Sequence, residues 1–114
     1  MMKVRLCISV LTIWMLCSCS YDKELPVDDC AITNSSFQAA ILPILQNTCA
    51  AGSSCHGDGS FNGPGPLTDY TKAKAASIAM RDAVHSGRMP QGSTLPASQR
   101  QAIICWVNSG APNN

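Results

Sequence analysis

Residues 49–56 hold the side chains whose types and spacing are best suited to chemistry. Cys49 and Cys55 are separated by five residues, and His56 follows the second cysteine directly. Two thiols can add to the vinyl groups of a haem, and an imidazole beside the second thiol can bind the iron. The usual attachment motif has only two residues between its cysteines. Counting back by that spacing from Cys55 reaches Gly52, so the sequence leaves open one thioether bond or two.

Two other interpretations remain open for the same residues. The first is a zinc site, because four thiolate and imidazole ligands suit zinc. Its spacing matches no common zinc finger, and its candidate ligands are Cys30, Cys49, Cys55, His56 and Cys105. The second is a small surface lipoprotein held by disulfides, with no cofactor.

The N-terminal residues predict export. Lys3 and Arg5 precede an apolar run at residues 6–16, which is the order of a secretory signal. The run is shorter than the roughly 20 residues that span a bilayer, which disfavours a transmembrane anchor. Residues 16–19 resemble a lipobox, so we expect a signal peptide at 1–18 and a lipidated Cys19, with the chain anchored in the periplasm or outer membrane. Cleavage nearby without lipidation is the alternative.

The seven cysteines divide between these roles. Cys7 and Cys17 leave with the signal peptide, and Cys19 takes lipid. Exported chains meet an oxidising compartment, where free thiols without a purpose are unexpected. If Cys49 and Cys55 hold haem, the two that remain form a disulfide between the start of the domain and its last helix; these are Cys30 and Cys105.

The charge of the chain excludes nucleic acid as a plausible partner. The formal net charge is +1, and six basic and seven acidic side chains remain once Lys3 and Arg5 are removed. Basic residues gather after Tyr70, where only Asp82 opposes Lys72, Lys74, Arg81, Arg88 and Arg100. This pattern fits the solvated faces of helices, or a docking patch for an acidic redox partner.

Local patterns predict an all-α domain at residues 35–114, preceded by a flexible tether at 19–34. Apolar residues recur at helical spacing from Phe37 to Thr48 behind the cap candidates at 35–36. Pro43 either kinks this helix or lies in the first turn of one that starts near Leu42.

Two further helices complete the predicted domain. One spans about residues 71–86, with Thr68 and Asp69 as cap candidates and Gly87 as its stop, and the last runs from Pro96 to about residue 109. No alternating strand pattern is found. A loop at 57–66, rich in glycine and proline, can approach a flat ligand closely.

The order of these segments resembles a class I monohaem cytochrome c, and more narrowly the small lipoprotein cytochromes. The resemblance covers about residues 35–114. It is carried by Pro43-Ile44-Leu45, by Cys49 with Cys55-His56, by the loop 57–66, by Gly87-Arg88-Met89-Pro90, and by Trp106-Val107-Asn108-Ser109-Gly110-Ala111-Pro112.

The resemblance implies a cytochrome c-like fold around one covalently bound haem c. His56 would be the proximal iron ligand and Met89 the distal one, with Met80 packed beside the haem. His85 is the rival of Met89 and would give bis-histidine ligation. With both axial positions filled, the chain would act as an electron carrier and not as an enzyme.

Outer-sphere transfer to a redox partner protein follows from the same resemblance. Arg88, Lys72 and Lys74 are the candidates for contact with that partner or with the haem propionates.

Overall fold

The computed structural model describes residues 29–114, which form helices and contain no strand. The all-α prediction is confirmed for this part of the chain. The signal peptide and Cys19 lie outside the described residues. No helix between residues 29 and 114 has the length and apolar character needed to cross a membrane.

The first helix covers residues 37–49 without a break at Pro43. It consists of η2 (Phe37–Ile41), α1 (Leu42–Ile44) and η3 (Leu45–Cys49). The segments on both sides of the proline have wide π-type turns. A proline ring clashes with the carbonyl four residues earlier in a regular α-helix, and a wider turn relieves that clash. A helix start near Leu42 is therefore wrong, and the cap is Ser36, whose hydroxyl accepts from the Ala39 amide.

The second predicted helix is two helices, α2 (Tyr70–Ala75) and α3 (Ser77–His85). The Asp69 carboxylate caps α2 by accepting from the Lys72 amide at 3.0 Å. Hydrogen bonds from the backbone and then the side chain of Lys72 lower the pKa of Asp69. The break falls at the buried Ala76, which is neither glycine nor proline. The sequence therefore carries no local stop signal at this break.

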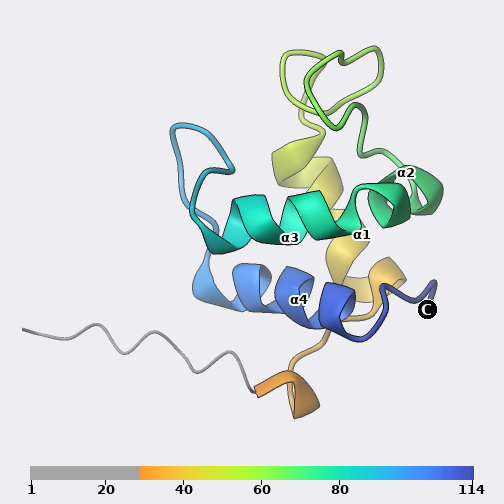
Figure 1. Cartoon of the computed structure of the whole chain (residues 1–114), viewed down its shortest axis with the longest axis vertical. Coiled ribbons are helices and arrows are strands. Elements are labelled where there is room, and N and C mark those ends of the chain that lie inside the picture. Colours follow the sequence, from red (N-terminus) through yellow and green to blue (C-terminus); the bar gives the residue numbers. More distant parts are fainter. Residues whose placement is uncertain (1–28) are drawn as a thin grey trace, which may run out of the picture.

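The last helix, α4 (Ala97–Asn108), follows a loop at residues 86–96. Gly87 ends α3 with a φ of 72°, a conformation that side chains with a Cβ rarely adopt. Pro96 occupies the N-cap position and not the first turn. In Figure 1, α3 and α4 lie side by side and antiparallel, and the first helix crosses behind them.

Aromatic and aliphatic side chains join these helices in one core. The fully buried ones include Phe37, Ile41, Leu45, Ile103 and Trp106, none more than 1 % exposed. The ring of Phe37 lies 5.5 Å from that of Trp106 between centroids. The core therefore links the first helix to α4.

A disulfide between Cys30 and Cys105 ties the segment before the first helix to α4, with a Cα–Cα distance of 5.4 Å. Cys30 belongs to the short turn η1 (Asp29–Ala31). Directly after Cys105, near the C-terminal end of α4, the Trp106 indole donates to the Pro112 carbonyl at 2.9 Å. The C-terminal residues then return to the first helix, where the amide of Gln38 donates to the Asn114 carbonyl at 2.8 Å.

Candidate cofactor-binding site

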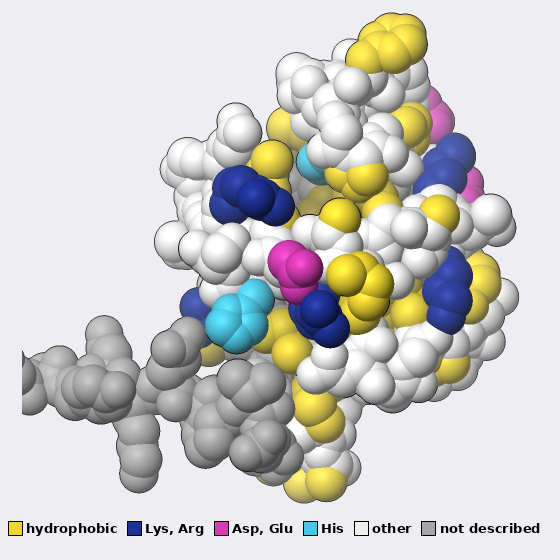
Figure 2. All heavy atoms as spheres, in the orientation of Figure 1, with side chains coloured by type: hydrophobic (Ala, Val, Ile, Leu, Met, Phe, Trp, Pro, Cys, Tyr) yellow, Lys and Arg dark blue, Asp and Glu magenta, His cyan; other side chains and the backbone are white. Residues whose placement is uncertain are grey.

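A cavity of about 910 Å³ opens above α3. Its walls come from the end of the first helix, the loop at residues 50–69, α3, and the loop at residues 86–96. Figure 1 shows both loops on the same side of α3, and Figure 2 shows the hollow between them, with hydrophobic, basic and histidine side chains around it. The volume falls in the upper range of small-molecule and cofactor sites.

Four of the predicted site residues line this one cavity: Cys49, Cys55, His56 and Met89. Cys49 is the last residue of the first helix and is half-buried, whereas Cys55 is exposed. His56 is buried, and Met89 is half-buried on the opposite loop. Two thiols, an imidazole and a thioether from distant parts of the sequence therefore face the same space.

The imidazole of His56 is held by the glycine-rich loop. Its Nδ1 lies 3.0 Å from the carbonyl oxygen of Gly65. Because a carbonyl can only accept a hydrogen bond, Nδ1 carries the proton, and in the neutral ring Nε2 keeps its lone pair. The Leu67 amide also donates to the His56 carbonyl at 2.8 Å. A histidine oriented in this way is suited to binding a metal through Nε2.

Met89 has one rival in the cavity wall. Met80 also lines the cavity, but it is only 5 % exposed and belongs to the core. Met89 lies in the loop after Gly87, and its amide donates to the Ala83 carbonyl at 3.1 Å. His85 is exposed and does not line the cavity. The lining therefore favours a methionine over His85 as a second ligand in the same cavity.

The lining suits a flat apolar ring that carries carboxylates. The floor is aliphatic, with Leu67, Ala79, Met80, Ala83, Val84 and Leu95. Most of the polar lining residues are exposed, namely Ser54, Asn62, Arg88, Gln91 and Ser93, whereas Thr48 is half-buried. An apolar floor with a polar rim lets a haem bury its ring and keep its propionates near water and a guanidinium. The residues present thus fit the group that the sequence predicts.

The structure separates the three basic residues proposed to contact a partner or the propionates. Lys72 pairs with Asp69, with 2.9 Å between Nζ and Oδ2. Lys74 donates to the carbonyls of Gly110 and Ala111. Of the three, only Arg88 lines the cavity. Arg88 is therefore the basic residue with access to a bound ligand.

The zinc interpretation loses two of its five candidate ligands, because Cys30 and Cys105 are bonded to each other. Cys49 and Cys55 are the free thiols among the described residues. No three histidine, cysteine or acidic side chains between residues 29 and 114 cluster as a metal site.

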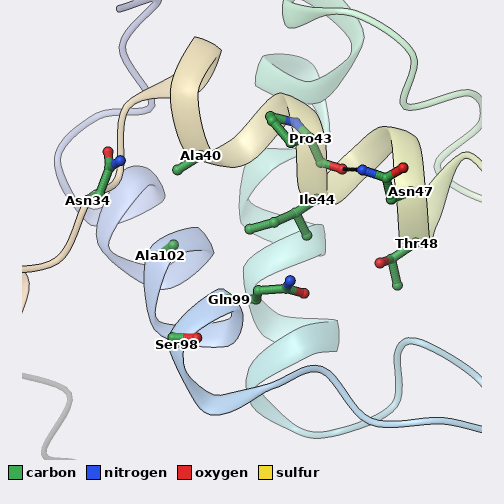
Figure 3. A pocket seen from close by; sticks show the side chains of 9 residues that line it. All are labelled: Asn34, Ala40, Pro43, Ile44, Asn47, Thr48, Ser98, Gln99 and Ala102. Carbon is green, nitrogen blue, oxygen red and sulfur yellow. Dashed lines mark hydrogen bonds between the residues drawn. The ribbon is translucent and has the colours of Figure 1, made fainter.

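A second cavity, of about 300 Å³, lies between the first helix and the start of α4 (Figure 3). Its lining has no charged side chain and none of the predicted site residues. The one hydrogen bond drawn there runs from the Asn47 amide group to the Pro43 carbonyl, at 2.8 Å. These groups offer no catalytic or metal-binding chemistry.

Two features of the large cavity could not be predicted from the sequence. The Gly65 carbonyl orients His56 from nine residues away, and glycine carries no side-chain signal for such a role. Leu95 lines the cavity from the end of a loop. The proline after Leu95 marks the start of α4, but nothing local predicts that the leucine turns toward the site.

Comparisons of the chain with protein-family models, with curated proteins and with solved structures give no match. The residues of the large cavity and their geometry therefore carry the functional conclusion.

Proposed function

We propose that this chain is a c-type cytochrome that carries electrons in the cell envelope, held at the membrane by a lipid on Cys19. One haem c occupies the large cavity. Covalent attachment is through Cys55, alone or together with Cys49, and His56 and Met89 are the axial ligands. The chain is not an enzyme in this proposal, because both axial positions are taken by its own side chains.

One observation supports this proposal above the others: a single cavity is lined by the free thiols of residues 29–114, by a buried imidazole and by the Met-Pro loop. A disulfide-stapled protein without a cofactor would have no need for this convergence. It would also leave an apolar hollow open to water, which is unfavourable in proportion to its area.

Each residue has a definite task in this site. The Gly65 carbonyl fixes the proton of His56 on Nδ1, so that Nε2 is presented to the iron. The aliphatic floor excludes water, and the Met89 thioether favours the reduced metal. A haem bound here supplies an iron that accepts and returns one electron.

The direct test is a pyridine haemochrome spectrum of the mature protein, expressed with a cytochrome c maturation system and washed with acid acetone. A haem c spectrum that survives the wash supports the proposal. A colourless protein contradicts it and turns attention to a metal assay and the disulfide-stapled alternative.

The distal ligand is tested by a matched pair of variants. Met89→Ala should open a coordination position, so that the ferrous protein binds carbon monoxide and the reduction potential falls. Met80→Leu, a change that nearly conserves volume at the cavity wall, should leave the iron closed to carbon monoxide. Carbon monoxide binding by Met80→Leu but not by Met89→Ala would reverse the assignment.

The redox partner is proposed to be an acidic protein that approaches Arg88. Attraction between opposite charges weakens as salt screens it, so reduction by such a partner should slow with rising ionic strength. Arg88→Gln should reduce that salt dependence. Lys72→Gln serves as the control, because Lys72 is already paired with Asp69. A rate that does not depend on salt contradicts an acidic partner.

The membrane anchor is tested by Cys19→Ala. In the proposal this variant loses its lipid label and moves from the membrane fraction to the soluble fraction. A variant that stays with the membrane contradicts lipidation at Cys19.

A further inference from the structure

The five residues between the two cysteines fold into a closed turn. The carbonyl oxygen of Gly52 accepts hydrogen bonds from the amides of Cys55, at 3.0 Å, and Gly57, at 2.9 Å. The backbone at Cys55 and at Gly57 is therefore held close to the same Gly52 oxygen. The usual motif has two residues between its cysteines, and this chain has three more. These extra residues fold into the compact turn, so they do not move the two cysteines apart.

A further hydrogen bond closes the base of this turn. The His56 amide donates to the Cys49 carbonyl at 2.9 Å. Cys49 itself is fixed as the last residue of the first helix, where the next amide, that of Ala50, donates to the Leu45 carbonyl at 2.7 Å. The backbone of the first cysteine therefore lies directly beside that of the histidine.

Gly57 shows how tightly the turn packs. A Cβ at this position would lie 2.8 Å from the carbonyl carbon and oxygen of Gly52 and 3.1 Å from the Ala50 oxygen. These are backbone atoms, which cannot move aside as a flexible side chain can. The glycine after the histidine is therefore required by the closed turn.

The two thiols share one space and remain unbonded to each other. Cys49 and Cys55 both line the large cavity, and both are free thiols in the described part of the chain. Burial, and secondarily the charge of Cys55, raise the pKa of the Cys49 thiol.

We infer that Cys49 and Cys55 each form a thioether bond to the same haem, across a spacing of five residues. This inference rests on the proposed function and specifies the number of bonds, which the sequence leaves open. In each addition the Sγ–H adds across a vinyl double bond: the sulfur bonds to one carbon and the hydrogen passes to the other. Nothing is released, and no oxidant or reductant is consumed.

A thiol count on the native sequence tests the inference without any variant. The mature protein is denatured without reductant, treated with iodoacetamide, digested and mapped by mass spectrometry. Two thioethers leave no alkylated residue between Lys23 and Lys72, because the disulfide protects Cys30. Alkylation of Cys49 in haem-bearing protein overturns the inference.

Variants give an independent spectroscopic readout. Each thioether saturates a vinyl group, which moves the α-band of the haemochrome to shorter wavelength. Cys49→Ala and Cys55→Ala should each keep haem through acid acetone and shift the α-band to longer wavelength, whereas the double variant should lose its haem. An α-band that is unchanged in Cys49→Ala means attachment through Cys55 alone and overturns the inference. Wild-type protein without covalent haem instead refutes the proposed function.

Discussion

The disulfide between Cys30 and Cys105 should supply a large share of the free energy of unfolding. It joins residues that are 75 apart, so it closes a loop around most of the described domain. A cross-link reduces the conformational entropy of the unfolded chain, and for this loop length the chain-entropy relation gives about 4.5 kcal/mol. Small domains have roughly 5–15 kcal/mol in total. Loss of the bond should therefore bring the domain close to unfolding.

Urea unfolding of the haem-bearing protein, followed by far-ultraviolet circular dichroism, measures this contribution. With slopes of about 1–3 kcal/mol per molar urea, Cys30→Ala should lower the midpoint by roughly 1.5–4.5 M. Cys30 is the better residue to replace because it is half-buried, whereas Cys105 is 2 % exposed and its truncation would also leave a hole in the core.

Wild-type protein with its disulfide reduced is the matched control, because it loses the cross-link and keeps every side chain. It should unfold at a urea concentration close to that of Cys30→Ala. A midpoint that stays in place on reduction would refute the entropic reasoning. A loss confined to the variant would assign the stability to the packing of the Cys30 side chain.

Three further predictions concern single residues. Asp69→Ala should lower the urea midpoint by removing the cap of α2. Because hydrogen bonds from Lys72 lower the folded pKa of Asp69, this contribution is present above its unfolded pKa, about 3.9, and fades as pH falls through the folded value, so the urea midpoints of wild type and variant should converge in acid. In haem-free protein whose far-ultraviolet circular dichroism matches that of the haem-bearing protein, iodoacetamide should modify Cys55 before Cys49, because burial raises the pKa of the Cys49 thiol. Equal rates in that folded protein would contradict the burial of Cys49. Gly57→Ala should lose about 1–3 kcal/mol in urea unfolding through overpacking, whereas Gly63→Ala, with open space around its Cβ, should match the wild type.

The helices were predictable where the signals were local. Ser36 and Asp69 cap the helices that follow them, and Gly87 ends α3, because each acts on backbone groups within three or four residues. The break at Ala76 and the passage through Pro43 were not predictable in the same way. Neither an alanine nor a mid-helix proline specifies the outcome alone.

The convergence of site residues could be predicted from side-chain chemistry, but their surroundings could not. Few kinds of site combine two thiols, an imidazole and a methionine in this order along the chain, so the sequence alone is enough to assign them to one site. The engagement of Lys74 by the carbonyls of Gly110 and Ala111 depends on the path of the C-terminal residues. Only the folded chain shows that this lysine, unlike Arg88, is turned away from the site.

The positions of the disulfide and of the hydrogen bonds between segments give the proposed haem a structural role as well as a redox role. On one side, the disulfide joins Cys30 to α4, and Asn114 closes onto the first helix. On the cavity side, each loop is held separately: His56 bonds to Gly65 within its own loop, and Met89 bonds back to α3. A group attached through the cysteines and ligated by His56 and Met89 would join these two loops and cover the aliphatic floor between them. A small domain has little core to spare for an open cavity of this size, so the same bonds that carry the electron would also complete the fold.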